Sequence, residues 1–160
     1  MEQAGNPFDE QHELRDLAGR TIQEAIEYRR TLDKCNMAAE FRAQAREAEM
    51  FDEQLGALPT IDLEAGIALF TAMATDSADQ LRDSAACYAD LLFAADKVAG
   101  TRIYCTLFYD PRPSVAEGAF ENLIWAVEAG RILPEDAAPL ADVYHTANAR
   151  LHRKWEHPDY

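Results

Sequence analysis

Apolar residues recur at three- and four-residue steps along most of the chain, the spacing that places side chains on one face of a helix. One such stripe runs from Leu14 to Leu32 and a second runs from Met37 to Leu55, with a break in the pattern at residues 33–36. No stretch alternates between apolar and polar residues for long enough to indicate a strand. The pattern therefore predicts an all-α protein of about six helices.

Capping signals bound the N-terminal pair of helices. Asn6 can open the first helix through its side-chain oxygen, and the proline that follows it suits a first helical turn. Gly56 and Pro59 are expected to end the second helix. The break near Asn36 fits either a tight turn or a phase shift within one long helix, and we favour a helical hairpin over residues 1–57.

The stretch 65–92 recurs in the chain as the stretch 99–126. The offset between the two stretches, from residue 65 to residue 99, is called the repeat shift below. The matching positions lie on both sides of an acidic turn: Gly66 with Gly100, Leu69 with Ile103, Phe70 with Tyr104, Met73 with Leu107, Asp76 with Asp110, and Leu81 with Val115. A period of this size, built from two helical patterns, is typical of stacked antiparallel helix pairs. We therefore expect repeat-like helix pairs over residues 60–155, in one domain that spans residues 1–160.

Local signals mark the helix ends of this second region. Thr60 can cap its first helix, which is apolar almost all round and is expected to be buried. Ser114 and Glu117 have the spacing of a capping box, and Gly130 is the residue type favoured just past a helix C-terminus. Pro134 can begin the final helix, giving either a short α-solenoid or a helical bundle.

The second helix of the first copy resembles that of a HEAT repeat. In that family an acidic turn, here Asp76, precedes an apolar-Arg pair, here the pair that ends in Arg82, and small and apolar positions follow. In the second copy Asp110 matches the turn, but Ala116 replaces the arginine, so we expect no Asp–Arg ladder between the copies. The resemblance covers residues 61–130 and implies an interaction scaffold rather than an activity.

Charge and composition narrow the function classes. The chain of 160 residues is 48% hydrophobic, ample for a continuous core, and its 15 basic and 29 acidic residues give a net charge of -14. This charge repels phosphates, which argues against nucleic acid as the main ligand and favours a basic protein partner. The sequence shows no export signal and no apolar run long enough to span a membrane, so we expect neither. Cys35, Cys87 and Cys105 lie in apolar helical patterns typical of reduced core residues, so we expect a cytoplasmic protein.

Five carboxylates fall away from the apolar positions on the second helix of each copy: Asp83, Asp90, Glu117, Glu121 and Glu128. Stacking the copies is expected to bring them onto one face, and in helix-pair arrays this helix lines the concave surface. A solvated face that keeps the protein soluble is the alternative explanation. The binding interpretation predicts a small module for a basic protein, for instance an inhibitor or immunity-type protein of a nucleic-acid-binding partner.

Two Asp-x-x-His pairs suggest a competing hypothesis. Asp9 with His12, and Asp142 with His145, each place a carboxylate and an imidazole on one helix face, where facing pairs could share a metal ion. A helical metal-binding protein or metalloenzyme is therefore one alternative, and a structural subunit of a larger assembly is another. No nucleophile elbow, phosphate-binding loop or dinucleotide fingerprint is present, so the sequence favours a protein that is not an enzyme and has no cofactor.

Overall fold

The computed structural model describes residues 21–32 and 38–156, with side chains described for 21–32 and 45–149. Within these residues the chain contains helices and no strand, which confirms the all-α prediction, and it has seven helices where about six were expected. They are α2 (Ile22–Thr31), α3 (Ala38–Ile61), α4 (Leu63–Ala74), α5 (Asp79–Ala95), α6 (Lys97–Phe108), α7 (Pro113–Glu128) and α8 (Pro134–Glu156). The predicted helix start at Asn6 and the break at 33–36 lie outside the described residues.

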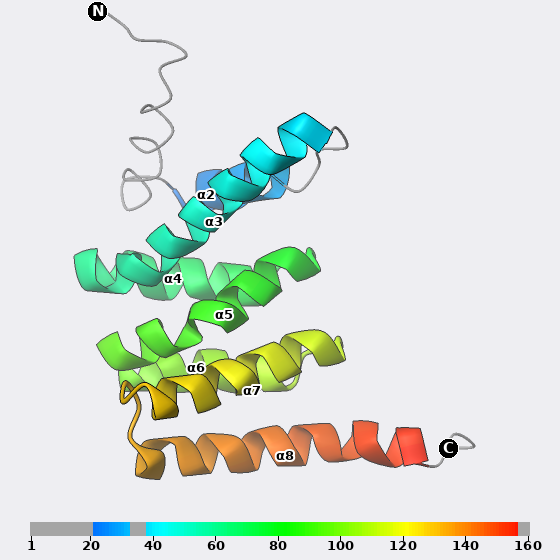
Figure 1. The fold of residues 1–160 in the computed structure, drawn as a ribbon. Helices are drawn as coiled ribbons and strands as arrows, with labels where there is room; N and C mark the ends of the chain where they lie inside the picture. The colour runs from blue at the N-terminus through cyan, green and yellow to red at the C-terminus, as the bar shows by residue number, and fades with distance from the viewer. Residues whose placement is uncertain (1–20, 33–37, 157–160) are drawn as a thin grey trace, which may run out of the picture.

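The helices stack along one direction in two layers. Figure 1 shows α3, α5 and α7 one below another, with α4 and α6 behind them and α8 closing the C-terminal end. Helix α5 lies at the centre and packs against α3, α4, α6 and α7, while α8 packs against α6 and α7. The middle of the molecule is therefore the most heavily covered part of the chain.

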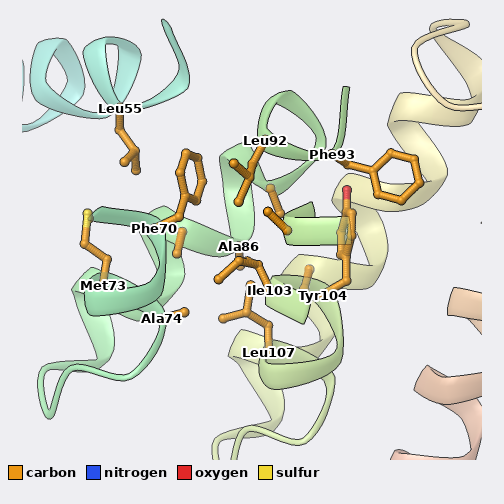
Figure 2. Packing of buried hydrophobic residues seen from close by; sticks show 14 of the residues in the cluster. Leu55, Phe70, Met73, Ala74, Ala86, Leu92, Phe93, Ile103, Tyr104 and Leu107 are labelled. Carbon is orange, nitrogen blue, oxygen red and sulfur yellow. The ribbon is translucent and has the colours of Figure 1, made fainter. Parts of the chain in front are cut away.

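One hydrophobic cluster runs through the stack. Figure 2 shows its centre, where side chains of α4, α5 and α6 meet: Phe70, Met73, Ala86, Leu92, Ile103, Tyr104 and Leu107. The predicted inward positions of α5 are all buried, including Leu81 and Leu92. The expectation that α4 is buried all round is wrong, because Leu63 at its start is 38% exposed and Ala68 and Thr71 further along are exposed. Ile61, just before α4, is 65% exposed.

The end of α3 also differs from the prediction. Thr60 was expected to cap the next helix, and Gly56 and Pro59 to end this one, but α3 continues through all three residues to Ile61. Gly56 serves packing instead of termination, since a Cβ there would lie 2.6 Å from Leu91 Cδ1 of α5. Tertiary contact between α3 and α5 therefore overrides the local stop signal.

Two aspartates related by the repeat shift open α4 and α6 in the same way. Asp62 and Asp96 have extended backbones, and their carboxylates accept hydrogen bonds from the backbone N–H groups of Ala65 and Ala99, at 3.1 and 3.0 Å. Such caps satisfy N–H groups that the helix itself leaves unpaired. When the bounds of α4 and α5 are moved by the repeat shift, they coincide with those of α6 and α7, except that α7 ends one position earlier.

Ion pairs cross between neighbouring helix pairs at the acidic turns. Arg82 Nε lies 2.7 Å from Asp110 Oδ2, its Nη1 donates to the carbonyl of Asp76 at 3.0 Å, and Arg30 of α2 pairs with the Asp76 carboxylate. The expectation that no Asp–Arg contact joins the two copies is therefore wrong. The contact needs the arginine of the first copy and the aspartate of the second, so Ala116 does not interrupt it.

The two ends of α7 test two cap predictions. The helix begins near Ser114 as predicted, but the capping box is wrong, because α7 starts at Pro113 and its N-cap residue, Arg112, makes no side-chain cap. Proline at the first helical position sets this start, since its fixed φ suits a first turn and its missing N–H would be unpaired there.

The prediction that Gly130 lies just past the C-terminus of α7 is confirmed. Gly130 has φ of +79°, in the left-handed region that only glycine adopts easily. Its N–H donates to the carbonyl of Val127 at 3.1 Å, and the N–H of Arg131 donates to the carbonyl of Ala126 at 2.9 Å. This is the bonding pattern of a Schellman motif, which ends the helix and redirects the chain toward α8.

The corner between α5 and α6 generates a stability prediction. A Cβ on Gly100 would lie 2.3 Å from Phe93 Cα, so the backbone of α5 or α6 would have to move. We expect Gly100→Ala to lower the free energy of unfolding by at least the ~1–3 kcal/mol typical of overpacked cores, measured by denaturant titration. The matched control is Gly118→Ala in α7, where the new Cβ would meet only Ala86 Cβ at 4.0 Å. That variant should be unchanged or more stable by up to about 1 kcal/mol, and equal losses at the two sites would contradict the packing.

Candidate functional site

The exposed side of the α3, α5 and α7 layer carries carboxylates from all three helices. They are Glu49, Asp52 and Glu53 of α3, Asp83 of α5, and Glu117 and Glu121 of α7. We call these six residues the acidic face, and the layer in which they lie is the front one in Figure 1. At its α3 edge Asp52 pairs with Arg29 of α2, whose Nε lies 3.2 Å from Asp52 Oδ1.

Cys87 lies on the exposed strip of α5, and the pKa of its thiol depends on the carboxylates around it. Burial raises the pKa of its thiol, and the negative charges of Asp52, Asp83 and Glu121 raise that pKa further. These three residues come from three different helices. Carboxylates that are far apart in the sequence therefore act on one point of the surface.

Two tyrosines show that the acidic face extends to either side of Cys87. Burial raises the pKa of Tyr88, and carboxylates of α3, first among them Asp52, raise it further. Burial also raises the pKa of Tyr144 on α8, with additional contributions from Glu117 and Glu121. The negative potential thus reaches from α3, across α5 and α7, to α8.

Little positive charge offsets the α5 and α7 part of the acidic face. In the part of the chain that the structure describes, Asp83, Glu117 and Glu121 make no ion pair. Arg82 is adjacent to Asp83 but directs its guanidinium to Asp110. Burial raises the pKa of Asp83, an effect that the charge of Arg82 opposes. This part of the face therefore presents carboxylates without matching cations.

Asp90, predicted to be one of the exposed carboxylates, is 1% exposed. Its carboxylate accepts a hydrogen bond from Asn122 Nδ2 at 3.0 Å and lies 2.7 Å from Arg131 Nη1. Asn122 Oδ1 in turn accepts from the Tyr104 hydroxyl at 2.5 Å, and burial raises the pKa of that hydroxyl. Because α3 and α7 both flank α5, the exposed strip of α5 is too narrow to include Asp90. The prediction that Asp90 contributes to a binding surface is wrong, and its contacts are those of a core residue.

Glu128, the last predicted carboxylate, is exposed and borders a different feature. A groove of about 370 Å³ lies between α7 and α8, with Glu128 as the charged residue of its lining. The rest of its lining is apolar and includes Phe120, Leu123, Ile124 and Val127 of α7 with Ala138 and Ala141 of α8. We call this feature the α7–α8 groove.

The predicted metal pairs are not brought together within the described residues. Asp142 and His145 are exposed on α8, and Asp9 and His12 lie outside the described part of the chain. Among residues 21–32 and 45–149, no group of three or more His, Cys, Asp or Glu side chains is placed so that it could hold a metal. The ring of His145 instead meets Phe120 edge-on, with centroids 5.3 Å apart.

The cysteine prediction fails at Cys87, which is exposed, while Cys105 is half-buried and Cys35 lies outside the described residues. The carboxylates of α3 were not among the predicted site residues. A signal for them exists, because the repeat shift continues backward: Leu58 matches Leu92 as Asp62 matches Asp96. Extending the repeat by one helix would have added α3 to the helices expected to carry the acidic face.

Comparisons with family models, with curated proteins and with solved structures find no match. Among residues 21–32 and 38–156, no helix combines the length and the apolar character needed to cross a bilayer. Three features remain from which a function can be inferred: the acidic face, the α7–α8 groove and the Asp90 cluster. The Asp90 cluster consists of Asp90, Asn122, Tyr104 and Arg131.

The Asp90 cluster generates a second stability prediction. Arg131→Ala should leave the buried Asp90 carboxylate without its cation and lower the free energy of unfolding by about 1–3 kcal/mol, measured by urea titration. The loss is smaller than for a fully buried pair because the Arg131 side chain is 41% exposed. The matched control is Arg112→Ala, which breaks an ion pair with Asp79 in which the Arg112 side chain is 57% exposed. That exposed pair should contribute less than about 1 kcal/mol. Comparable losses in the two variants would contradict a structural function for Asp90.

The potential of the acidic face can be measured at Cys87 without any partner. Because thiolate is the reactive form, and both burial and nearby carboxylates raise the pKa of this thiol, alkylation of Cys87 at neutral pH should be slow. Glu121→Lys should lower that pKa and speed alkylation, followed site by site by mass spectrometry in a Cys35→Ala background. Cys105 is the internal control, since burial alone raises the pKa of its thiol. An unchanged Cys87 rate, or an equal acceleration at Cys105, would show that Glu121 does not act on this point.

Proposed function

We propose that the chain is a small module of HEAT-like helix pairs that binds a basic protein partner on its acidic face. The observation that carries the proposal is the convergence on Cys87 of carboxylates from α3, α5 and α7. Bringing like charges together costs folding free energy. A surface that gathers Asp83, Glu117 and Glu121 and leaves them unpaired is suited to a partner that supplies the cations.

Features that recur along the chain support this proposal independently. Helix bounds recur after the repeat shift, Asp62 and Asp96 make equivalent caps, and the Arg82–Asp110 ion pair joins one helix pair to the next. Arrays of stacked helix pairs commonly bind partners on the extended surface that equivalent helices form together. The acidic face lies on such a surface, formed by α3, α5 and α7.

The partner's chemistry follows from charge complementarity. With a net charge of -14, the chain attracts proteins whose surfaces carry clustered Lys and Arg, as phosphate-binding surfaces do. A row of carboxylates can occupy such a surface in place of phosphates. An inhibitor or immunity-type protein of a nucleic-acid-binding protein is therefore the specific form we propose, acting in the cytoplasm, without a cofactor and without catalysis.

The test is a charge reversal on the acidic face. The wild-type chain captures its partner from the native host, and the association rate is then measured for the wild type and for Glu117→Lys with Glu121→Lys. The double variant should associate more slowly, and the wild-type rate should fall as added salt shortens the screening length to about 8 Å at physiological ionic strength. Thermal stability should hardly change, because both residues are exposed on α7.

Glu24→Lys with Glu64→Lys is the matched control. It changes the net charge by the same amount on α2 and α4, outside the acidic face, and each reversal costs less than about 1 kcal/mol of helix-dipole stabilisation. If the two double variants slow association equally, only net charge matters and the acidic face is no binding site. If Glu117→Lys with Glu121→Lys unfolds the protein, these residues are structural.

A further inference from the structure

The α7–α8 groove is an apolar concavity with exposed walls. Its volume of about 370 Å³ lies at the lower end of the roughly 300–1,000 Å³ of ligand pockets, which suits one or two apolar side chains better than a large cofactor. Ile124, on the α7 wall, is 43% exposed, and Phe120 and Val127 lie beside it on the same wall. Apolar surface held open to water in this way is characteristic of an interaction site.

Carboxylates border this apolar floor on both helices. On α7, Glu121 and Glu128 lie three positions before and four positions after Ile124, so all three share one helix face. On α8, Glu135 and Asp142 stand in the same relation to Ala138. All four carboxylates are exposed, and none makes an ion pair within the part of the chain described.

The groove is held open by aromatic packing at one end. The rings of Phe120 and Tyr144 stack with centroids 4.0 Å apart, and Phe108 of α6 meets Tyr144 edge-on at 5.4 Å. These contacts fix α8 against α7 and α6, so the groove does not depend on a ligand for its shape. Because Glu121 belongs to both the acidic face and the groove rim, the two features form one continuous surface.

We propose that the α7–α8 groove receives a basic amphipathic helix of the partner. Its apolar stripe would enter the groove between Ile124 and Ala138, while Lys and Arg on either flank would meet the carboxylates of α7 and α8. This inference rests on the proposed function and names the partner segment that the acidic surface recognises. A second copy of this chain is disfavoured as the occupant, because two surfaces of the same net negative charge repel each other.

Two synthetic peptides separate the groove from the acidic face. The first is a helix of about 20 residues, above the ~12–15 at which isolated helices are marginal in water, with leucines at i, i+4 and i+7 and lysines on both flanks. The second has the same composition with the leucines scattered, so that it keeps the charge and loses the stripe. Fluorescence anisotropy against the full chain should give at least about tenfold tighter binding for the striped peptide.

Groove variants locate the binding. Ala138→Trp fills the groove from an exposed position on α8 and should weaken the striped peptide at least about tenfold without affecting the scattered one. If Ala138→Trp fails to fold, Ile124→Ser is used in its place. This variant removes apolar surface without adding bulk and should also weaken binding of the striped peptide. Thermal unfolding of each variant serves as the folding control.

The outcomes distinguish this inference from the proposed function. If both peptides bind equally and both weaken in Glu117→Lys with Glu121→Lys, the acidic face binds cations and the groove inference is overturned. If neither peptide binds, or binding ignores salt, the proposed function falls as well. If an uncharged peptide with the same leucine stripe binds equally well, the acidic rims do not contribute to binding, and the inference is overturned. A dimer in sedimentation that Ala138→Trp dissociates would assign the groove to a second copy instead.

Discussion

Helix α5 packs closely between α3 and α7, and a small residue lies at each contact: Gly56 on α3 and Gly118 on α7. The buried alanines of α5 are Ala85, Ala86 and Ala89, and Gly56 of α3 leaves room for the side chains opposite. This close packing excludes water from the flanks of α5, so Asp90 has to be paired inside the protein. The same closeness brings the carboxylates of α3 and α7 within electrostatic range of Cys87. The buried polar cluster and the acidic face are thus two results of one packing constraint.

The fold could be predicted largely because helical periodicity is local information. Apolar spacing identified the helices from α4 onward and the inward positions of α5, such as Leu81 and Leu92, without knowledge of any neighbour. The failures occur where a neighbour decides the outcome. Pro59 predicts a helix end but lies inside α3. Ser114 predicts a helix N-cap but follows a proline that already starts α7.

The candidate site divides along the same line. Glu117 and Glu121 could be predicted because α7 exposes a broad strip to solvent, whereas the exposure of Asp90 depends on how α3 and α7 cover α5. The α7–α8 groove gave no signal in the sequence. It depends on how α7 and α8 pack together, for instance through the Phe120–Tyr144 stack, and no single helix carries that information.

The corners of the stack differ in how much chain they contain. Asp62 alone joins α3 to α4, and Asp96 alone joins α5 to α6. One inserted residue would turn the next helix by about 100° and displace it from its cap, so these corners are fixed in length. The corner at residues 129–133 is longer and the space around Gly130 is open, but Arg131 pairs with Asp90 of α5 and Ile132 is buried. A change of length at this corner would therefore act on two features together: the α7–α8 groove, and the Arg131–Asp90 ion pair that ties the corner to α5.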